Sequence, residues 1–313
     1  MARAFVFPGQ GSQAVGMGQP LAEAFPIARH TFEEIDDALN QGLSRLMLEG
    51  PEDELTLTEN AQPALMAVSL AVMRVLESEG GLDIGASVAC VAGHSLGEYS
   101  ALTAAGSFTI ADTARLLKTR GRAMQEAVPL GAGGMAALIG TDLDGARALA
   151  ELAAEGEVCS PANDNAPDQV VLSGTAAAID RAVALAPDQG IKRAIPLQVS
   201  APFHCSLMAP AAAVMEEALS KVDVAPPLVP LIANVTASPV EDPDTICRQL
   251  VEQVTGMVRW RECVLAIRER EIDTLVEIGS GKVLSGLTRR IDRELTSLSV
   301  GDPDGVEAFL KTL

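Results

Sequence analysis

A serine stands between two glycines in the stretch AGHSLGEYSA, residues 92–101, directly after the apolar residues 88–91. In a strand–turn–helix context, Gly-x-Ser-x-Gly is the pattern of a nucleophile elbow, because two residues without side chains let the backbone turn sharply and expose the hydroxyl. An ordinary glycine turn is the alternative interpretation. A serine hydroxyl is a weak nucleophile by itself, so the hypothesis that Ser95 is catalytic requires a base within hydrogen-bond reach.

The chain contains three histidines that could be this base. His30 lies off the apolar stripe of its predicted helix and is expected at the surface. His94 directly precedes Ser95, where a tight turn makes a mutual hydrogen bond awkward. His204 lies in SAPFHCSLM, a loop that enters a helix, and is therefore the predicted base, although a lone histidine at such a place is more often structural. Cys205 beside it is expected to be a buried, inert thiol rather than a nucleophile.

An acyl-transfer reaction also needs hydrogen-bond donors for the oxyanion of its transition state. In hydrolase-type elbows one donor is the backbone N–H of the residue after the nucleophile, here Leu96, and the other comes from a loop after an early strand. The segment FVFPGQGSQ, with Gln10 between two glycines, is such a loop. Residues 9–14 also match a loose dinucleotide-binding fingerprint, so a nucleotide-binding or scaffolding protein is a weaker alternative.

Arg120 occupies the apolar face of a helix predicted over residues 112–127. The apolar positions of that face are Leu116, Leu117, Ala123, Met124 and Ala127. A guanidinium on a buried face is costly unless it meets an anion. The sequence leaves two partners open: a carboxylate of the protein in a structural ion pair, or the carboxylate of a substrate held by a two-pronged contact.

The elements that would position these residues follow an α/β order. Apolar periodicity predicts a strand at residues 3–7, an amphipathic helix over 21–39, and a helix over 60–78 that is apolar nearly all round and therefore central. Residues 129–200 have the order β-α-β-β-α-β of a ferredoxin-like unit, which can be inserted whole into another domain. We therefore predict a hydrolase-like subdomain with a parallel sheet, formed by residues 1–128 and 201–313, and an inserted ferredoxin-like subdomain.

Composition excludes several classes of protein. The net charge of −19 and the aromatic content of 3% argue against a nucleic-acid partner, because phosphates attract positive charge and single strands stack on aromatic rings. The start of the chain lacks a signal-peptide core, and no apolar segment is long enough for a bilayer, so we expect a cytoplasmic protein without a membrane partner. The five cysteines are scattered without a Cys-x-x-Cys pair, which indicates reduced thiols and no zinc site.

A series of motifs runs along nearly the whole chain, in the order FPGQGSQ, ENAQPAL, GHSLGEYSAL, Arg120-Gly121, SAPFH, NVTA, EQVTGMVRW and EIGSGKVLSGL. In these motifs the sequence resembles a known family, the malonyl-CoA:acyl-carrier-protein transacylases of bacterial fatty acid synthesis. The family has a hydrolase-like large subdomain with a ferredoxin-like insertion. The resemblance also implies roles for matching residues: nucleophile Ser95, base His204, carboxylate-binding Arg120, oxyanion amides of Gln10 and Leu96, a histidine-orienting backbone carbonyl at Gln253, and malonyl-selecting Phe203.

The resemblance implies transfer of malonyl from malonyl-CoA to the phosphopantetheine thiol of acyl carrier protein, through a serine-bound ester. A Ser-His dyad, no metal or other cofactor, and a monomeric enzyme are expected. A serine hydrolase or thioesterase would use the same elbow and histidine and stays the main alternative. Ser280 stands where the family usually has proline, so a local change in that loop is expected.

The family's carrier protein is acidic, and this chain is acidic too. Long-range repulsion would slow their encounter unless basic side chains gather near the mouth of the site. The candidates for such a docking surface are Lys192, Arg193, Lys282, Arg289 and Arg290.

Overall fold

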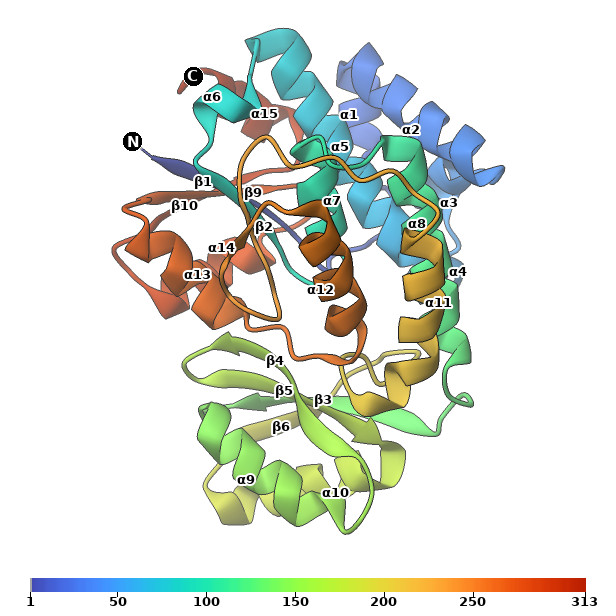
Figure 1. Ribbon diagram of the computed structural model, residues 1–313, viewed down its shortest axis with the longest axis vertical. Helices are drawn as coiled ribbons and strands as arrows, with labels where there is room; N and C mark the ends of the chain where they lie inside the picture. The colour runs from blue at the N-terminus through green and yellow to red at the C-terminus, as the bar shows by residue number, and fades with distance from the viewer. Residues whose placement is uncertain (1) are drawn as a thin grey trace.

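The computed structural model describes residues 2–313 and contains two β-sheets, a large one and a small one (Figure 1). The large sheet has the strand order β10-β9-β1-β2-β7-β8, and every neighbouring pair is parallel except β7 with β8. Its strands are β1 (Arg3–Phe7), β2 (Cys90–Gly93), β7 (Leu231–Ile232), β8 (Pro239–Val240), β9 (Thr274–Ile278) and β10 (Thr296–Val300).

Helices cover both faces of the large sheet, because its central strands are apolar on both sides. Phe5 and Phe7 of β1 join a core formed with one layer of helices, whereas Ala4 and Val6 join a second core with α13 (Trp260–Glu269) and α14 (Val283–Ile291). The helices of the first layer are α1 (Gln19–Ala24), α2 (Pro26–Leu39), α3 (Leu43–Glu49), α4 (Glu52–Thr56), α5 (Thr58–Gly80), α6 (Ile84–Ser87), α7 (Gly97–Ala104), α8 (Ile110–Glu126), α11 (Ala209–Leu219), α12 (Pro243–Thr255) and α15 (Pro303–Leu310).

Two sequence-based helix predictions have different outcomes. The central helix is confirmed as α5, which is buried on nearly every side. The single helix over 21–39 is wrong, because the chain forms α1 and α2 with Phe25 in an extended conformation between them. Pro26 is the physical reason: its ring disfavours the helical conformation for the residue before it, and it fits well at the first position of a new helix.

The small sheet is antiparallel, with the strand order β4-β5-β3-β6 (lower part of Figure 1). Its elements, in the order β-α-β-β-α-β, are β3 (Gly133–Ile139), α9 (Leu143–Ala154), β4 (Cys159–Ala166), β5 (Gln169–Thr175), α10 (Ala176–Leu185) and β6 (Arg193–Pro196), with the short helix η1 (Ala186–Gln189) before β6. The predicted α/β fold class with a ferredoxin-like unit is confirmed. The subdomain boundaries at residues 129 and 200 stay a prediction.

Alternation along β3 gives the small sheet two different faces. Ala136 and Leu138 pack against α9 and α10, whereas Met135 and Ala137 point to the opposite face, toward Phe203. The edge strand β4 pairs with Val258, in the loop between α12 and α13. The Asp164 N–H donates to the Val258 carbonyl oxygen, and the Val258 N–H donates to the Ala162 carbonyl oxygen, both at 2.9 Å. One face of the small sheet therefore forms a wall opposite the carboxyl ends of β1 and β2.

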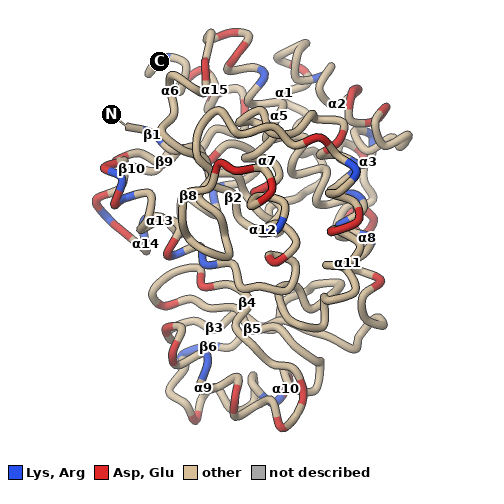
Figure 2. The backbone as a smooth tube through the Cα atoms, viewed as in Figure 1, with Lys and Arg blue, Asp and Glu red and all other residues tan. Residues whose placement is uncertain are grey.

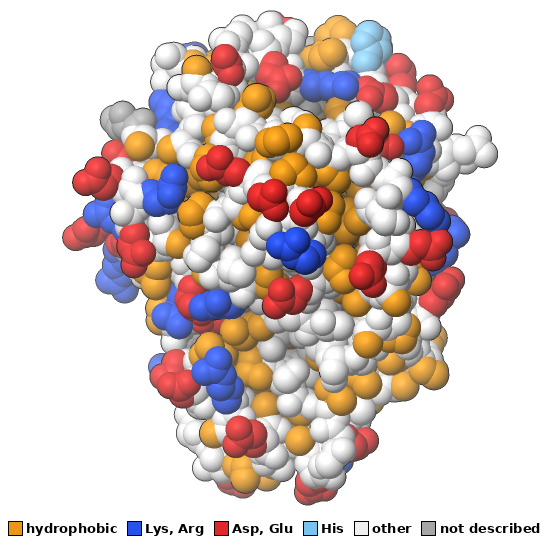
Figure 3. All heavy atoms as spheres, in the orientation of Figure 1, with side chains coloured by type: hydrophobic (Ala, Val, Ile, Leu, Met, Phe, Trp, Pro, Cys, Tyr) orange, Lys and Arg blue, Asp and Glu red, His pale blue; other side chains and the backbone are white. Residues whose placement is uncertain are grey.

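Charged residues are spread over helices around both sheets (Figure 2). On the face drawn in Figure 3, basic side chains are scattered among acidic ones. The five candidate docking residues are all exposed, and one of them, Arg290, forms an ion pair of 2.6 Å with Asp168 in the β4–β5 turn. Within residues 2–313, no helix combines the length and apolar character that crossing a membrane requires.

Candidate active site

Ser95 lies at the turn between the end of β2 at Gly93 and the start of α7 at Gly97, which is the strand–turn–helix context that the elbow hypothesis needs. Its φ of 54° is in the left-handed region, which a residue with a side chain seldom adopts. Both glycines are required by space: a Cβ on Gly93 would lie 1.9 Å from the Gly97 carbonyl carbon, and one on Gly97 would lie 2.2 Å from the Phe7 carbonyl oxygen.

Asn234, in the loop after β7, holds this strained turn from both sides. The Ser95 backbone N–H donates to Asn234 Oδ1 at 2.8 Å, and Asn234 Nδ2 donates to the Gly93 carbonyl oxygen at 2.7 Å. The Asn234 side chain is fully buried, so both hydrogen bonds are shielded from water. The turn is thus fixed by a residue far away in the sequence.

His204 is hydrogen-bonded to Ser95, with 2.8 Å between His204 Nε2 and Ser95 Oγ. The other ring nitrogen, Nδ1, is 2.8 Å from the backbone carbonyl oxygen of Gln253 in α12. Because that carbonyl can only accept, it assigns the proton to Nδ1 and leaves Nε2 free to accept from the serine hydroxyl. Burial, and secondarily the positive charge of Arg120, lowers the pKa of His204 to about 3, so the ring is neutral at ordinary pH.

Arg120 of α8 is 1% exposed, and its guanidinium contacts neutral oxygens. It donates to Gln62 Oε1 at 2.8 Å, to Gln253 Oε1 at 2.8 Å and to Ser95 Oγ at 3.1 Å. Its Nε has no partner, and within residues 2–313 the guanidinium forms no ion pair with a carboxylate. The predicted alternative of a structural ion pair with the protein is therefore wrong for this geometry. A buried positive charge remains beside the serine.

Two backbone amides border the same space. Within residues 2–313, neither the Gln10 N–H, in the loop after β1, nor the Leu96 N–H, at the start of α7, donates to a protein acceptor. The Gln10 side chain is turned toward Thr58, with 3.3 Å between its Nε2 and the threonine oxygen. Unpaired amide donors beside a serine hydroxyl can stabilise negative charge on a carbonyl oxygen.

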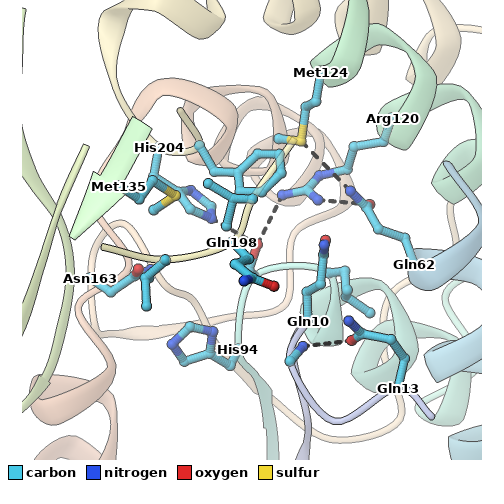
Figure 4. A pocket seen from close by; sticks show the side chains of 16 residues that line it. Gln10, Gln13, Gln62, His94, Arg120, Met124, Met135, Asn163, Gln198 and His204 are labelled. Carbon is cyan, nitrogen blue, oxygen red and sulfur yellow. Dashed lines mark hydrogen bonds between the residues drawn. The ribbon is translucent and has the colours of Figure 1, made fainter. Parts of the chain in front are cut away.

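These groups line a cavity of about 300 Å³ between the two sheets (Figure 4). It brings together six of the seven predicted site residues, namely Gln10, Ser95, Leu96, Arg120, Phe203 and His204. The seventh, Gln253, is fully buried behind them. Residues 9–14, the weaker nucleotide-binding candidate, border this cavity through Gln10, Gly11 and Gln13.

The sequence did not favour His30, His94 or Cys205 as base or nucleophile, and each has surroundings that agree with this. His30 is exposed on α2. His94 faces the cavity, but its Nε2 is 2.8 Å from Asn165 Oδ1 and its ring packs near Trp260. Cys205 is buried, and burial raises the pKa of its thiol, which opposes formation of a thiolate.

Sequence reasoning assigned no role to Gln62, Glu98 or Asn234. Each is a buried polar residue within or beside an apolar segment, and that is the signal that could have identified them. Gln62 is a polar residue in the predicted central helix, Glu98 follows the elbow glycine Gly97, and Asn234 belongs to the motif NVTA, which was noted for the family resemblance. Ser280 donates from Oγ to the Ser12 carbonyl oxygen at 3.0 Å, which ties its loop to the loop that carries Gln10.

The fold and the cavity together define an α/β protein of the nucleophile-elbow class. The acyl transferase domain family matches residues 4–297. The malonyl CoA-acyl carrier protein transacylase of Bacillus subtilis (strain 168) is 44% identical over 311 residues, covering 99% of this chain and 96% of the relative. The chain therefore belongs to the acyl transferase family.

Solved structures agree with this family. An acyl-carrier-protein-S-malonyltransferase from Bartonella henselae is 55% identical, with a TM-score of 0.97 and coverage of 100% of this chain and 99% of the other. A malonyl-transacylase solved in complex with the acyl-carrier protein of a type II polyketide synthase is 42% identical, with a TM-score of 0.96 and full coverage of both chains.

Proposed function

We propose that this protein transfers a malonyl group from malonyl-CoA to the phosphopantetheine thiol of an acyl carrier protein. Full-length similarity to transacylases that carry this name supports the proposal, as does the neighbour solved with its carrier protein. The observation that carries it is the buried Arg120 guanidinium, which lacks a carboxylate partner within residues 2–313 and lies 3.1 Å from Ser95 Oγ. A malonyl group supplies the missing carboxylate while it presents its thioester to the serine.

In the first half-reaction, Ser95 Oγ attacks the thioester carbonyl carbon of malonyl-CoA while His204 Nε2 takes the hydroxyl proton. The oxyanion accepts hydrogen bonds from the Gln10 and Leu96 amides. The carbon–sulfur bond then breaks, and the coenzyme A sulfur leaves with the proton from His204. The product is malonyl-Ser95 and free coenzyme A.

In the second half-reaction, the carrier's phosphopantetheine thiol gives its proton to His204 and attacks the malonyl ester. The ester bond to Ser95 breaks, and the serine oxygen recovers the proton. Each bond that forms or breaks is balanced by one proton transfer through His204, so the proposed reaction uses no redox or metal cofactor. Monomeric state and cytoplasmic location stay predictions from the sequence.

Intact-mass spectrometry of the protein mixed with malonyl-CoA alone tests the proposal. We expect the wild-type chain to gain one malonyl group and to lose it when phosphopantetheinylated carrier is added, with malonyl recovered on the carrier. Ser95→Ala should show no adduct, and an adduct that persists in this variant would assign the nucleophile to another residue. Release of free malonate without transfer to the carrier would favour the serine hydrolase alternative.

A further inference from the structure

Glu98, in the first turn of α7, is an acidic residue buried behind the elbow. Its side chain is 2% exposed and lies outside the residues that line the cavity. One carboxylate oxygen accepts the Asn234 backbone N–H at 2.5 Å, and the other accepts the side-chain amide Nε2 of Gln253. Burying a carboxylate is costly unless its oxygens are hydrogen-bonded, and both oxygens of Glu98 have a donor.

Gln253 connects this carboxylate to the guanidinium of Arg120. Its Oε1 accepts from Arg120 at 2.8 Å, while its Nε2 faces Glu98 and also donates to the Ser95 carbonyl oxygen at 2.9 Å. An arginine can only donate, and an ionised carboxylate can only accept. These two neighbours therefore fix the orientation of the Gln253 amide. A flipped amide would point its NH₂ group at the Arg120 donors and its oxygen at the Glu98 oxygen.

We propose that Glu98 is a positioning residue that sets malonyl selectivity, because its carboxylate holds the Gln253 amide in the one orientation that aims the Arg120 guanidinium into the acyl site. This inference rests on the proposed malonyl transfer. The chain of contacts runs from Glu98 through Gln253 to Arg120 and Ser95. An acyl group without a carboxylate forms no ion pair with the guanidinium, so its transfer depends far less on Glu98.

The two donors explain why a carboxylate is needed at this place. Asn234 and Gln253 each direct an N–H to a different oxygen of Glu98. A glutamine offers one acceptor oxygen, so one of these buried donors would lose its partner or the Gln253 amide would turn. Turning the amide would point an NH₂ group at Arg120 and displace the guanidinium.

The charge of Glu98 also depends on pH. Burial raises the pKa of its carboxyl to about 8, opposed by the Asn234 and Gln253 donors and by the charge of Arg120. Burial lowers the pKa of the His204 imidazole, which therefore stays neutral. Burial also raises the pKa of three neighbouring groups, which stay neutral too: Tyr99, Cys247 and Cys263. Arg120 is then the charged group that faces Glu98. As pH falls through the pKa of Glu98, the carboxyl takes up a proton and loses acceptor capacity, so malonyl selectivity should fall.

Glu98→Gln tests this inference, with Glu277→Gln as a matched control. Glu277 of β9 is also fully buried and accepts two backbone amides, those of Leu284 and Ser285, at 3.0 and 2.8 Å. The measurement is the kcat/KM for acylation of Ser95 by malonyl-CoA and by acetyl-CoA. At about pH 9, above the pKa of Glu98, we expect the malonyl-to-acetyl ratio to fall at least about tenfold in Glu98→Gln, as for loss of a hydrogen bond to a charged group, and to stay unchanged in Glu277→Gln.

A pH series on the wild-type protein keeps the inference testable if Glu98→Gln does not fold. The malonyl-to-acetyl ratio should rise between roughly pH 6 and 9, because Glu98 loses its proton in this range. His204 acts on both acyl groups alike, so its own protonation cancels in the ratio. A flat ratio over this range, a pH dependence that persists in Glu98→Gln, or an equal loss for both acyl groups would overturn the inference. Absence of any malonyl-enzyme in the wild type would instead refute the proposed function.

Discussion

Replacing Arg120 by alanine separates substrate recognition from folding in this site. The guanidinium donates three hydrogen bonds to Gln62, Gln253 and Ser95, all of them neutral groups. A substrate carboxylate would therefore be its first fully charged hydrogen-bond partner. Without the side chain, that carboxylate enters a buried cavity unpaired, which costs more than the net value of the pair itself.

The size of the effect follows from the strength of such a contact. A hydrogen bond to a charged group contributes roughly 1.5 to 3 kcal/mol, so kcat/KM for malonyl-CoA should fall by at least about tenfold to a hundredfold. Acetyl transfer should stay level or rise. Arg120 lowers the pKa of His204, so removing this charge makes the imidazole a stronger base for any acyl group.

The assay compares initial rates of malonyl and acetyl transfer to carrier for wild type and Arg120→Ala, together with thermal unfolding. Some loss of stability is expected, because the variant leaves the buried oxygens of Gln62 and Gln253 without their donor. Acetyl transfer is the internal control for correct folding. If malonyl and acetyl rates fall together, in proportion to the loss of stability, Arg120 has a structural role and the reasoning is wrong.

Further predictions concern the base and the docking surface. His204→Ala should lose most transfer activity in a steady-state assay while His30→Ala keeps it, because His204 is hydrogen-bonded to the serine hydroxyl and His30 is exposed on α2; equal losses would contradict the assignment. Reversing the charge of Arg289 and Arg290 should raise the KM for carrier but not for malonyl-CoA, by weakening electrostatic attraction to an acidic partner. Since Arg290 also pairs with Asp168, Arg289→Glu alone is the cleaner variant, and an equal effect on both substrates would exclude a docking role.

The sequence predicted the elements with strong local signals. The apolar α5, the elbow turn and the β-α-β-β-α-β order each depend on residues close together in the chain, where periodicity and glycine spacing are informative. The break at Phe25 was missed because apolar periodicity continues across it, although Pro26 marked a boundary. The β4 strand runs to Ala166, into the segment DNAPD at residues 164–168 whose residue types favour a turn, because pairing with β5 extends a segment that has weak strand propensity.

The candidate site could be predicted only in part, because its groups act through long-range contacts. Ser95 is recognisable from its glycines, and His204 by elimination, but nothing local connects either of them to Gln253, which lies 158 residues from Ser95 along the chain. Asn234 and Glu98 are polar residues whose partners are set by the packing of α7, α12 and the loop after β7. Tertiary structure alone decides which backbone amide or side-chain oxygen they meet.

The arrangement of charge in this core explains how an arginine can be buried and still be available to a substrate. Had Glu98 contacted Arg120 directly, the pair would neutralise itself, and an incoming carboxylate would have to displace a protein ligand. The Gln253 amide between them transmits orientation without supplying a counter-charge, since it accepts from Arg120 and donates to Glu98. The positive charge therefore faces the cavity beside Ser95. The carboxylate of a malonyl group can pair with this guanidinium, whereas an acetyl group has no carboxylate to do so.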